Sequence, residues 1–191
     1  HLGHLITAEN AFDAAGLDEV LLMPTGCSYF KEDQRVTPAW QRYEMTCLAA
    51  EGNPHFRATD LETKRPGNSY TAVTLQEMKK LRPGDELFYI VGADTLVMMS
   101  MWKDPQVIFD SCTLLVETRR DEVADSGLED EAEKLRQAYG ARIVFLPARN
   151  IEISSTEIRT RVRGGRSIHY LVPDRVEQYI LEHGLYQSTG R

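Results

Sequence analysis

The sequence lacks the usual marks of secreted and membrane proteins. Its 191 residues include three cysteines, Cys27, Cys47 and Cys112, and no C-x-x-C pair, so neither a disulfide framework nor a zinc knuckle is expected. No apolar run approaches the roughly 20 residues that cross a bilayer, and no signal-peptide pattern is visible. We therefore expect a cytoplasmic protein that has no membrane partner.

An excess of positive charge is also missing. The formal net charge is −7, and binding to a nucleic-acid backbone requires a basic surface, so we expect no nucleic-acid partner. The sequence contains neither G-x-x-x-x-G-K-[ST] nor G-x-G-x-x-G, which argues against a P-loop ATPase and an ordinary dehydrogenase. A small anionic substrate remains compatible with this composition where cations are concentrated locally.

Apolar runs alternate with stretches of helical spacing along the chain. Strands are expected at 20–23, 56–61, 87–91, 113–116 and 142–146, and helices at 5–15, 37–51, 71–81, 128–139, 155–163 and 173–182. Thr37 is expected to cap the second helix, with Pro38 in its first position. Buried strands separated by helices predict an α/β fold with a parallel sheet, and the length suits a single domain over residues 1–191.

The first pattern with chemical content is His1-Leu2-Gly3-His4 at the start of a helix. Two imidazoles three residues apart lie on one helical face, and the glycine allows close backbone approach. Since a helix N-terminus attracts anions, this turn suits a phosphate. The alternative is two histidines that happen to be close in a frayed terminus. A zinc site is a weaker alternative, because no other histidine has ligand spacing.

The second pattern is Ile153-Ser154-Ser155-Thr156-Glu157-Ile158-Arg159. Hydroxyl groups, free backbone N–H groups and an arginine together can bind a polyphosphate, since arginine makes fork-shaped contacts with phosphate oxygens. The alternative is structural, because Ser154 and Glu157 form an S-x-x-E capping box. The two interpretations are compatible, since a capped helix start can still bind an anion.

Together the two patterns resemble the signatures of the HxGH nucleotidyltransferase superfamily, His-x-Gly-His and Ile-Ser-Ser-Thr-x-Ile-Arg. Further stretches resemble the bacterial nicotinate mononucleotide adenylyltransferases: Ser69-Tyr70-Thr71, Val91-Gly92-Ala93-Asp94, Trp102-Lys103, Tyr170-Leu171-Val172-Pro173 and His183-Gly184-Leu185-Tyr186. The resemblance covers essentially the whole chain. It implies a Rossmann-like parallel sheet with helices on both faces, a small C-terminal helical part, and synthesis of nicotinate adenine dinucleotide in NAD biosynthesis.

The resemblance also implies roles for particular residues. ATP would contact His1, Gly3, His4, Ile153, Ser154, Ser155, Thr156 and Arg159, of which His1, His4 and Arg159 would be catalytic. The pyridine mononucleotide would contact Lys31, Tyr70, Thr71, Gly92, Asp94, Trp102 and Arg119. No residue is assigned as a metal ligand, because Mg²⁺ would arrive with ATP, held mostly by phosphates and water.

Physical chemistry supports some of the residue roles that the resemblance implies, and an alternative role remains for each residue. Tyr70 and Thr71 lead into a helix whose N–H groups favour a carboxylate over a neutral amide; the alternative is a Ser69 cap with ordinary turn residues. Trp102 can stack on a pyridine ring or belong to the core. Asp94, at the end of a strand, can accept ribose hydroxyls, or it can cap a helix. Arg119 can bind phosphate, or it can form a solvated pair with Arg120.

Four questions stay open at this point. The resemblance places a first strand and a glycine-rich turn ahead of the first histidine; both are missing from this sequence, and whether residues precede His1 is open. The family's Pro-Pro-His-Lys stretch corresponds here to Ser28-Tyr29-Phe30-Lys31, of which only Lys31 carries over. Rival functions are another transferase of the superfamily acting on phosphopantetheine or a similar phosphate, and a non-catalytic nucleotide-binding module. Whether the chain is a homo-oligomer is also open.

Overall fold

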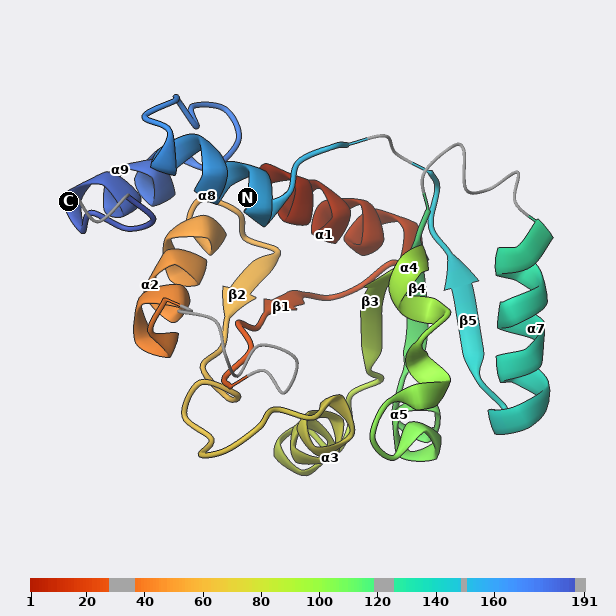
Figure 1. Cartoon of the computed structure of the whole chain (residues 1–191). Helices are drawn as coiled ribbons and strands as arrows, with labels where there is room; N and C mark the ends of the chain where they lie inside the picture. Colours follow the sequence, from red (N-terminus) through yellow and green to blue (C-terminus); the bar gives the residue numbers. More distant parts are fainter. Residues whose placement is uncertain (28–36, 119–125, 149–150, 188–191) are drawn as a thin grey trace. The chain divides into compact units, whose positions relative to one another are not determined.

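A computed structural model describes residues 1–27, 37–118, 126–148 and 151–187 of the chain (Figure 1). These residues form two compact units. The first consists of His1–Phe12, Leu17–Asn68 and Ile151–Arg191, and the second of Asp13–Gly16 and Ser69–Asn150. Among the helices within the described ranges, none is both long and apolar enough to cross a membrane.

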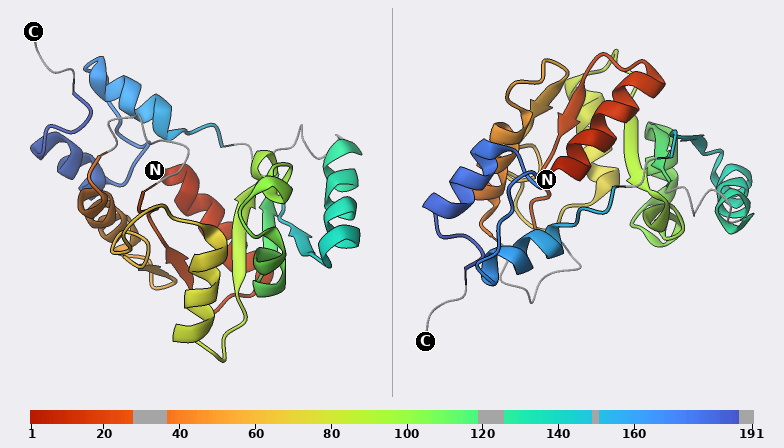
Figure 2. Two further views of the ribbon diagram at one scale, coloured as in Figure 1. Left: turned by 60° about the horizontal axis from the view of Figure 1, so that its bottom comes forward. Right: turned by 90° about the horizontal axis from the view of Figure 1, so that it is seen from above.

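The first unit contains a pair of parallel strands with helices packed around it. Its elements are α1 (Leu2–Ala15, whose last residues belong to the second unit), β1 (Val20–Leu22), α2 (Ala39–Ala50), β2 (Phe56–Ala58), α8 (Ser155–Arg163) and α9 (Asp174–Glu182). Val20 pairs with Phe56 and Leu22 with Ala58. Helix α2 packs against both β2 and α9, and Figure 2 shows α2 beside α9.

The end of α1 follows the sequence prediction. Gly16 has a φ of +61°, a left-handed conformation that ends the helix and favours glycine. The C-terminal part of this unit has its own apolar cluster, built from one face of each of α8 and α9 and the turn between them. Its buried members are Ile158, Ile168, Val172, Val176 and Ile180. The small C-terminal helical part predicted from the sequence is therefore present and holds α8 in place.

The second unit contains a three-stranded parallel sheet in the order β3-β4-β5. Its elements are α3 (Thr71–Leu81), β3 (Phe88–Gly92), α4 (Ala93–Leu96), η2 (Met99–Met101), α5 (Pro105–Ser111), β4 (Thr113–Glu117), α7 (Ser126–Tyr139) and β5 (Arg142–Phe145). The central strand β4 is the most buried, since Leu114, Leu115 and Val116 are inaccessible to solvent. Apolar residues of α4, α5 and α7 complete this core. The predicted α/β fold with parallel strands and packed helices is confirmed.

Several expected boundaries are wrong in detail. Thr37 does not cap α2: the helix begins at Ala39, and Pro38 precedes it in an extended conformation without a side-chain cap. The carbonyl of Thr37 instead accepts a hydrogen bond from Nε of Arg42 at 3.0 Å. The strand expected at 56–61 ends at Ala58, and α9 begins at Asp174, one residue later than expected. Helices α4 and α5 were not predicted, because each is only 4–7 residues long.

Candidate active site

His1 and His4 lie on one face of the first turn of α1, as the spacing predicted. Their rings stack with centroids 3.7 Å apart and an interplanar angle of 20°. The backbone N–H of His4 donates to Nδ1 of His1 at 3.3 Å. Because Nδ1 of His1 accepts this bond, the proton of its neutral ring belongs on Nε2. The two imidazoles therefore lie together at the start of α1, as their spacing predicted.

The protonation state of His4 follows from its surroundings. Burial by neighbouring protein atoms is the largest cause that lowers the pKa of His4 to about 4, and the positive charge of the amino terminus at His1 is the second, although the residue as a whole is exposed to solvent. Burial penalises the charged form of a histidine, so the ring is neutral near pH 7. A neutral imidazole can contact a phosphate oxygen by N–H donation, and a bound anion would raise the pKa of the ring again.

Gly3 brings the two sequence patterns together within the first unit. A Cβ atom at this position would lie 3.1 Å from Nδ1 of His1 and 3.4 Å from the carbonyl oxygen of Ile153. Both contacts are close, and Gly3 is buried, so a side chain would push at least one of these neighbours away. The turn that carries the histidines is thus in contact with the residue that precedes Ser154.

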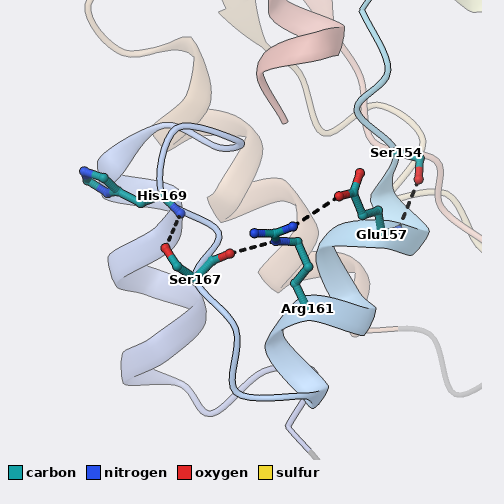
Figure 3. A network of polar contacts seen from close by, with 5 residues as sticks. All are labelled: Ser154, Glu157, Arg161, Ser167 and His169. Carbon is teal, nitrogen blue, oxygen red and sulfur yellow. Dashed lines mark hydrogen bonds and ion pairs between the residues drawn. The ribbon is translucent and has the colours of Figure 1, made fainter.

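The start of α8 is capped by the second pattern. Ser154 is the N-cap residue, and its Oγ accepts the backbone N–H of Glu157 at 3.1 Å, as Figure 3 shows. The capping interpretation of Ser154 is therefore confirmed. Ser155 and Thr156 follow with exposed side chains, and Nη2 of Arg159 donates to Oγ1 of Thr156 at 3.1 Å. Hydroxyl and guanidinium groups thus lie together at an exposed, capped helix start, where an anion is favoured.

Arg161 has a different environment from Arg159. Its Nε donates to the carbonyl oxygen of Ser167 at 2.8 Å, and its Nη1 lies 3.5 Å from Oε1 of Glu157. Oγ of Ser167 in turn accepts the backbone N–H of His169 at 3.1 Å, so these contacts link α8 to the turn before α9 (Figure 3). Arg161 therefore has a structural role, since its guanidinium is bound to protein groups, and Arg159 is the better placed of the two to bind phosphate.

In the second unit, Tyr70 and Thr71 stand at the start of α3. Tyr70 is the N-cap residue, and its side chain makes no cap hydrogen bond, so the alternative of Ser69 as the N-cap residue is wrong. The first backbone N–H groups of a helix have no partner inside it, and they give this end positive potential. Nζ of Lys103 lies 4.3 Å from the centroid of the Tyr70 ring, which adds a positive charge beside it.

Gly92 and Asp94 form a tight turn between β3 and α4. A Cβ atom at position 92 would be 2.6 Å from Oδ1 of Asp94, so the observed carboxylate position requires glycine there. Oδ1 of Asp94 also accepts the backbone N–H of Thr95 at 2.9 Å. The N-cap of α4 is Gly92, so Asp94 is not the capping residue. Its exposed carboxylate follows the end of a parallel strand, where ligands of α/β sheets bind.

Trp102 has features of both alternatives left open by the sequence. It is half-buried and packs against the apolar core of the second unit, while its neighbour Lys103 is exposed. It follows η2 directly, and Asp104 then takes a left-handed conformation with a φ of +52° before α5 begins. One part of the indole is thus anchored in the core and another part reaches the surface.

The predicted residues fall into two groups. His1, Gly3, His4, Ile153, Ser154, Ser155, Thr156 and Arg159 belong to the first unit, and Tyr70, Thr71, Gly92, Asp94 and Trp102 to the second. Lys31 and Arg119 lie outside the described residues. Two residues of the stretches that carry the resemblance, Lys103 and Leu171, were given no role. Nζ of Lys103 lies over the Tyr70 ring, and the carbonyl oxygen of Leu171 accepts the N–H of Leu2 at 2.9 Å.

The donor groups of the two patterns are imidazoles, hydroxyls and a guanidinium, which are poor ligands for Mg²⁺ compared with carboxylates and phosphates. Within the described ranges, one group of three side chains could hold a metal ion, namely His169, Asp174 and Glu177. Nδ1 of His169 is already 2.8 Å from Oε2 of Glu177, and this contact is the largest cause that raises the pKa of the histidine. The Glu177 carboxylate thus favours the protonated form of the His169 ring, and a protonated imidazole cannot bind a metal ion.

Comparison with known proteins gives a consistent result. Residues 1–161 match the cytidylyltransferase-like family. A Dehalococcoides mccartyi protein named "Probable nicotinate-nucleotide adenylyltransferase" is 38% identical over 97% of this chain and 91% of its own length. A Corynebacterium jeikeium protein of the same name is also 38% identical, over 99% of this chain and 96% of its own.

Solved structures agree on the fold. The Plasmodium falciparum nicotinic acid mononucleotide adenylyltransferase complexed with NaAD has a TM-score of 0.74. The match covers 96% of this chain and 89% of that chain at 16% identity. At this low identity the likeness concerns the fold alone, and it confirms the predicted Rossmann-like architecture.

Proposed function

The chain belongs to the cytidylyltransferase-like family and, within it, to the nicotinate-nucleotide adenylyltransferases, and from this premise we propose how its residues divide the work. The enzyme transfers the adenylyl group of ATP to nicotinate mononucleotide, which gives nicotinate adenine dinucleotide and pyrophosphate, a step of NAD biosynthesis. Both substrates are small molecules. The proposal concerns which side chains hold the triphosphate and which hold the acceptor.

The observation that carries the proposal is the contact between the two sequence patterns at Gly3. The carbonyl of Ile153 lies against this glycine, so the imidazoles of His1 and His4 and the start of α8 share one part of the first unit. Hydrogen-bond donors are gathered there from residues far apart in the sequence. We assign the triphosphate of ATP to this place, with Gly3, Ile153 and Ser154 shaping it and Ser155, Thr156 and Arg159 contacting the β- and γ-phosphates.

The reaction needs no protein nucleophile. A phosphate oxygen of nicotinate mononucleotide forms a bond to the α-phosphorus of ATP, and the bond from that phosphorus to the bridging oxygen of pyrophosphate breaks. The incoming substrate supplies the electron pair, and pyrophosphate leaves with the displaced one. Catalysis then consists of positioning and of stabilising the charge that develops on phosphate oxygens. His1, His4 and Arg159 supply donors for that charge.

We assign the acceptor to residues of the second unit. The start of α3 at Tyr70 and Thr71 favours the nicotinate carboxylate over the neutral amide of nicotinamide. The exposed part of Trp102 offers a face for the pyridine ring. Asp94, held in place by the turn at Gly92, accepts hydroxyl groups of the ribose. Lys31 and Arg119 are retained as phosphate contacts on the strength of the family resemblance.

An adenylyltransferase that uses ATP typically requires a divalent cation, and we propose Mg²⁺. Mg²⁺ prefers oxygen ligands and usually keeps several waters beside substrate phosphates. The residues that we assign to the triphosphate are not proposed as ligands of the ion. The ion would neutralise phosphate charge when bound. Glu157, one of the two carboxylates that flank Ile153–Thr156 in sequence, lies against Arg161, and no protein ligand is assigned to the ion.

Three broader expectations are kept as proposals. Residues 1–191 form one nucleotidyltransferase domain to which both compact units contribute. The enzyme acts in the cytoplasm, which is supported by three cysteines that are all free thiols, since cytosolic thiols stay reduced. A homo-oligomer is an open possibility that gel filtration with light scattering would resolve.

Release of pyrophosphate tests the assigned reaction. Purified protein is mixed with ATP, Mg²⁺ and one of three acceptors, namely nicotinate mononucleotide, nicotinamide mononucleotide or phosphopantetheine. We expect release with the first acceptor and at least ~10-fold lower kcat/KM with the second, which corresponds to about 1.4 kcal/mol of discrimination. Release with phosphopantetheine alone would contradict the acceptor assignment, and ATP binding without release would contradict catalysis.

A further inference from the structure

Arg42 of α2 makes an unusual set of contacts for a side chain that no motif includes. Its guanidinium donates to three backbone carbonyl oxygens: Nε to Thr37 at 3.0 Å, Nη2 to Gly26 at 2.7 Å, and Nη1 to Thr25. Burial is the largest cause that lowers the pKa of Arg42 from its usual range, which shows that the charged group is partly withdrawn from water. The group nevertheless stays protonated at neutral pH.

Each of the three guanidinium nitrogens of Arg42 thus donates to a backbone carbonyl. Three backbone carbonyls in one fork define both the position and the direction of the chain that carries them. Two of these carbonyls belong to Thr25 and Gly26, which follow β1 after Met23 and Pro24. Hydrogen bonds from a charged donor are worth more than neutral ones, so this anchor is strong for a segment outside regular secondary structure.

The anchored segment leads directly to a second contact. Cys27, the next residue after Gly26, forms an isolated parallel bridge with Asn68. Asn68 in turn precedes Ser69, Tyr70 and Thr71, the turn that opens α3. A chain of contacts therefore runs from Arg42 through Gly26 and Cys27 to Asn68, at the entry of the turn to which we assign the nicotinate carboxylate.

We propose that Arg42 is a positioning residue for the acceptor: by holding Thr25 and Gly26 it fixes the Cys27–Asn68 pairing, and through it the chain that enters the nicotinate-binding turn. This inference rests on the proposed function of that turn. Arg42 touches no substrate in this scheme. Its effect is on the affinity for nicotinate mononucleotide, whereas the triphosphate residues of α1 and α8 do not depend on it.

The test compares R42M and R42K with a matched control, R57M. Methionine keeps much of the length of the arginine stem and removes every donor, whereas lysine keeps the charge but cannot span three carbonyls in a fork. Arg57 is an exposed arginine of the same unit, and it is ion-paired with Glu19. We expect R42M to raise KM for nicotinate mononucleotide roughly 10-fold, R42K to have an intermediate effect, and R57M to have none. KM for ATP and kcat should change less than about 2-fold.

A structural readout accompanies the kinetics. Hydrogen exchange at the backbone amides around Cys27 and Asn68 should accelerate in R42M and not in R57M, because the pairing loses its anchor. Unchanged exchange there, or a KM that rises equally for both substrates, would overturn the proposal. If R42M fails to fold by circular dichroism, R42K decides the question, and an unchanged KM in a folded R42K with unchanged exchange overturns it.

The wild-type protein is assayed first, which separates the two hypotheses. Absence of pyrophosphate release by the wild type with nicotinate mononucleotide contradicts the proposed function. Normal wild-type turnover with an unaltered KM in R42M contradicts only the role of Arg42.

Discussion

At the scale of single residues, His4 and Gly92 show how a local contact defines a chemical property. The ring of His4 stacks on His1 and is neutral near pH 7 because burial disfavours its charge. The carboxylate of Asp94 keeps its position because Gly92 has no side chain. In both cases the neighbour, and not the residue type, decides what the functional group can do.

His4→Ala should lower kcat at least ~10-fold, the low end for loss of a contact that strengthens in the transition state. The assay is steady-state pyrophosphate release at saturating ATP and nicotinate mononucleotide. His183→Ala is a suitable control, since His183 is exposed and stacks on Tyr179 in α9. Equal kcat values for the wild type and H4A would remove His4 from the catalytic residues.

Binding of ATP should be coupled to proton uptake by His4. The pKa of His4 is lowered to about 4 in the free protein, and a neighbouring triphosphate favours the charged ring and raises this pKa. Between the pKa of His4 in the free protein and its higher pKa in the ATP complex, binding of ATP therefore takes up a proton. Calorimetric titrations at about pH 5.5 in buffers of different ionisation enthalpy measure this uptake. We expect His4→Gln to show less uptake than the wild type, and equal uptake would contradict the linkage.

Gly92→Ala should impair acceptor use through Asp94. The new Cβ would lie 2.6 Å from Oδ1 of Asp94, so the carboxylate must move, and we expect kcat/KM for nicotinate mononucleotide to fall roughly 10-fold. The double variant provides the control. In the Asp94→Ala background the clash is absent, so adding Gly92→Ala should change little. A full additional loss there would show that the effect does not act through Asp94.

At the scale of elements, the two functional helices begin in different ways. Helix α8 is capped by the Ser154 hydroxyl, whereas α3 starts at Tyr70 without a side-chain cap. A helix start capped by a side chain still attracts an anion, and the start of α3, where the N-cap side chain makes no cap hydrogen bond, has the same positive end. The first arrangement suits the triphosphate, and the second suits a carboxylate that must be bound directly.

Ser154→Ala should destabilise the protein by about 1 kcal/mol, the typical cost of losing an N-cap. Ser154→Gly is the matched comparison, because glycine at an N-cap costs only a few tenths of a kcal/mol relative to serine. Ser155→Ala, one residue further and exposed, should leave stability nearly unchanged. Urea denaturation followed by circular dichroism measures all three, and equal midpoints for S154A and wild type would argue against the cap.

At the scale of the whole molecule, folding depends on two apolar clusters. The first surrounds β4 and includes Leu114 and Val116, and the second joins α8 to α9 through Ile158 and Val176. The second cluster is small, and it supports the helix whose start we assign to phosphate. Ligands that bind the folded state should therefore stabilise the molecule measurably.

Mg²⁺–ATP at ~100 times its Kd should stabilise the protein by about 2.7 kcal/mol, which raises Tm by about 5–10 °C for a chain of this length. Differential scanning fluorimetry measures the shift. H4A at the same ATP concentration should show a smaller shift, while its response to nicotinate mononucleotide should match that of the wild type. An identical ATP response in H4A would show that His4 does not contribute to ATP affinity.

The sequence by itself determined the class of fold and the presence of both nucleotide patterns. Helix α1 ends at Gly16 as predicted, α3 and α8 have the predicted bounds, and Ser154 caps as its spacing with Glu157 indicated. These features depend on neighbouring residues: a glycine in the left-handed conformation ends a helix, a side chain caps a helix start, and apolar residues recur at helical spacing. A sequence shows such patterns directly.

The tertiary structure alone decided which distant groups meet. The carbonyl of Ile153 lies against Gly3, Lys103 lies over Tyr70, and Arg42 donates to the carbonyl oxygens of Gly26 and Thr37. It also decided that Pro38, and not Thr37, precedes α2, and that His4 is neutral. Such contacts and the burial that shifts a pKa arise from packing between segments far apart in the chain, for which no residue spacing is a guide.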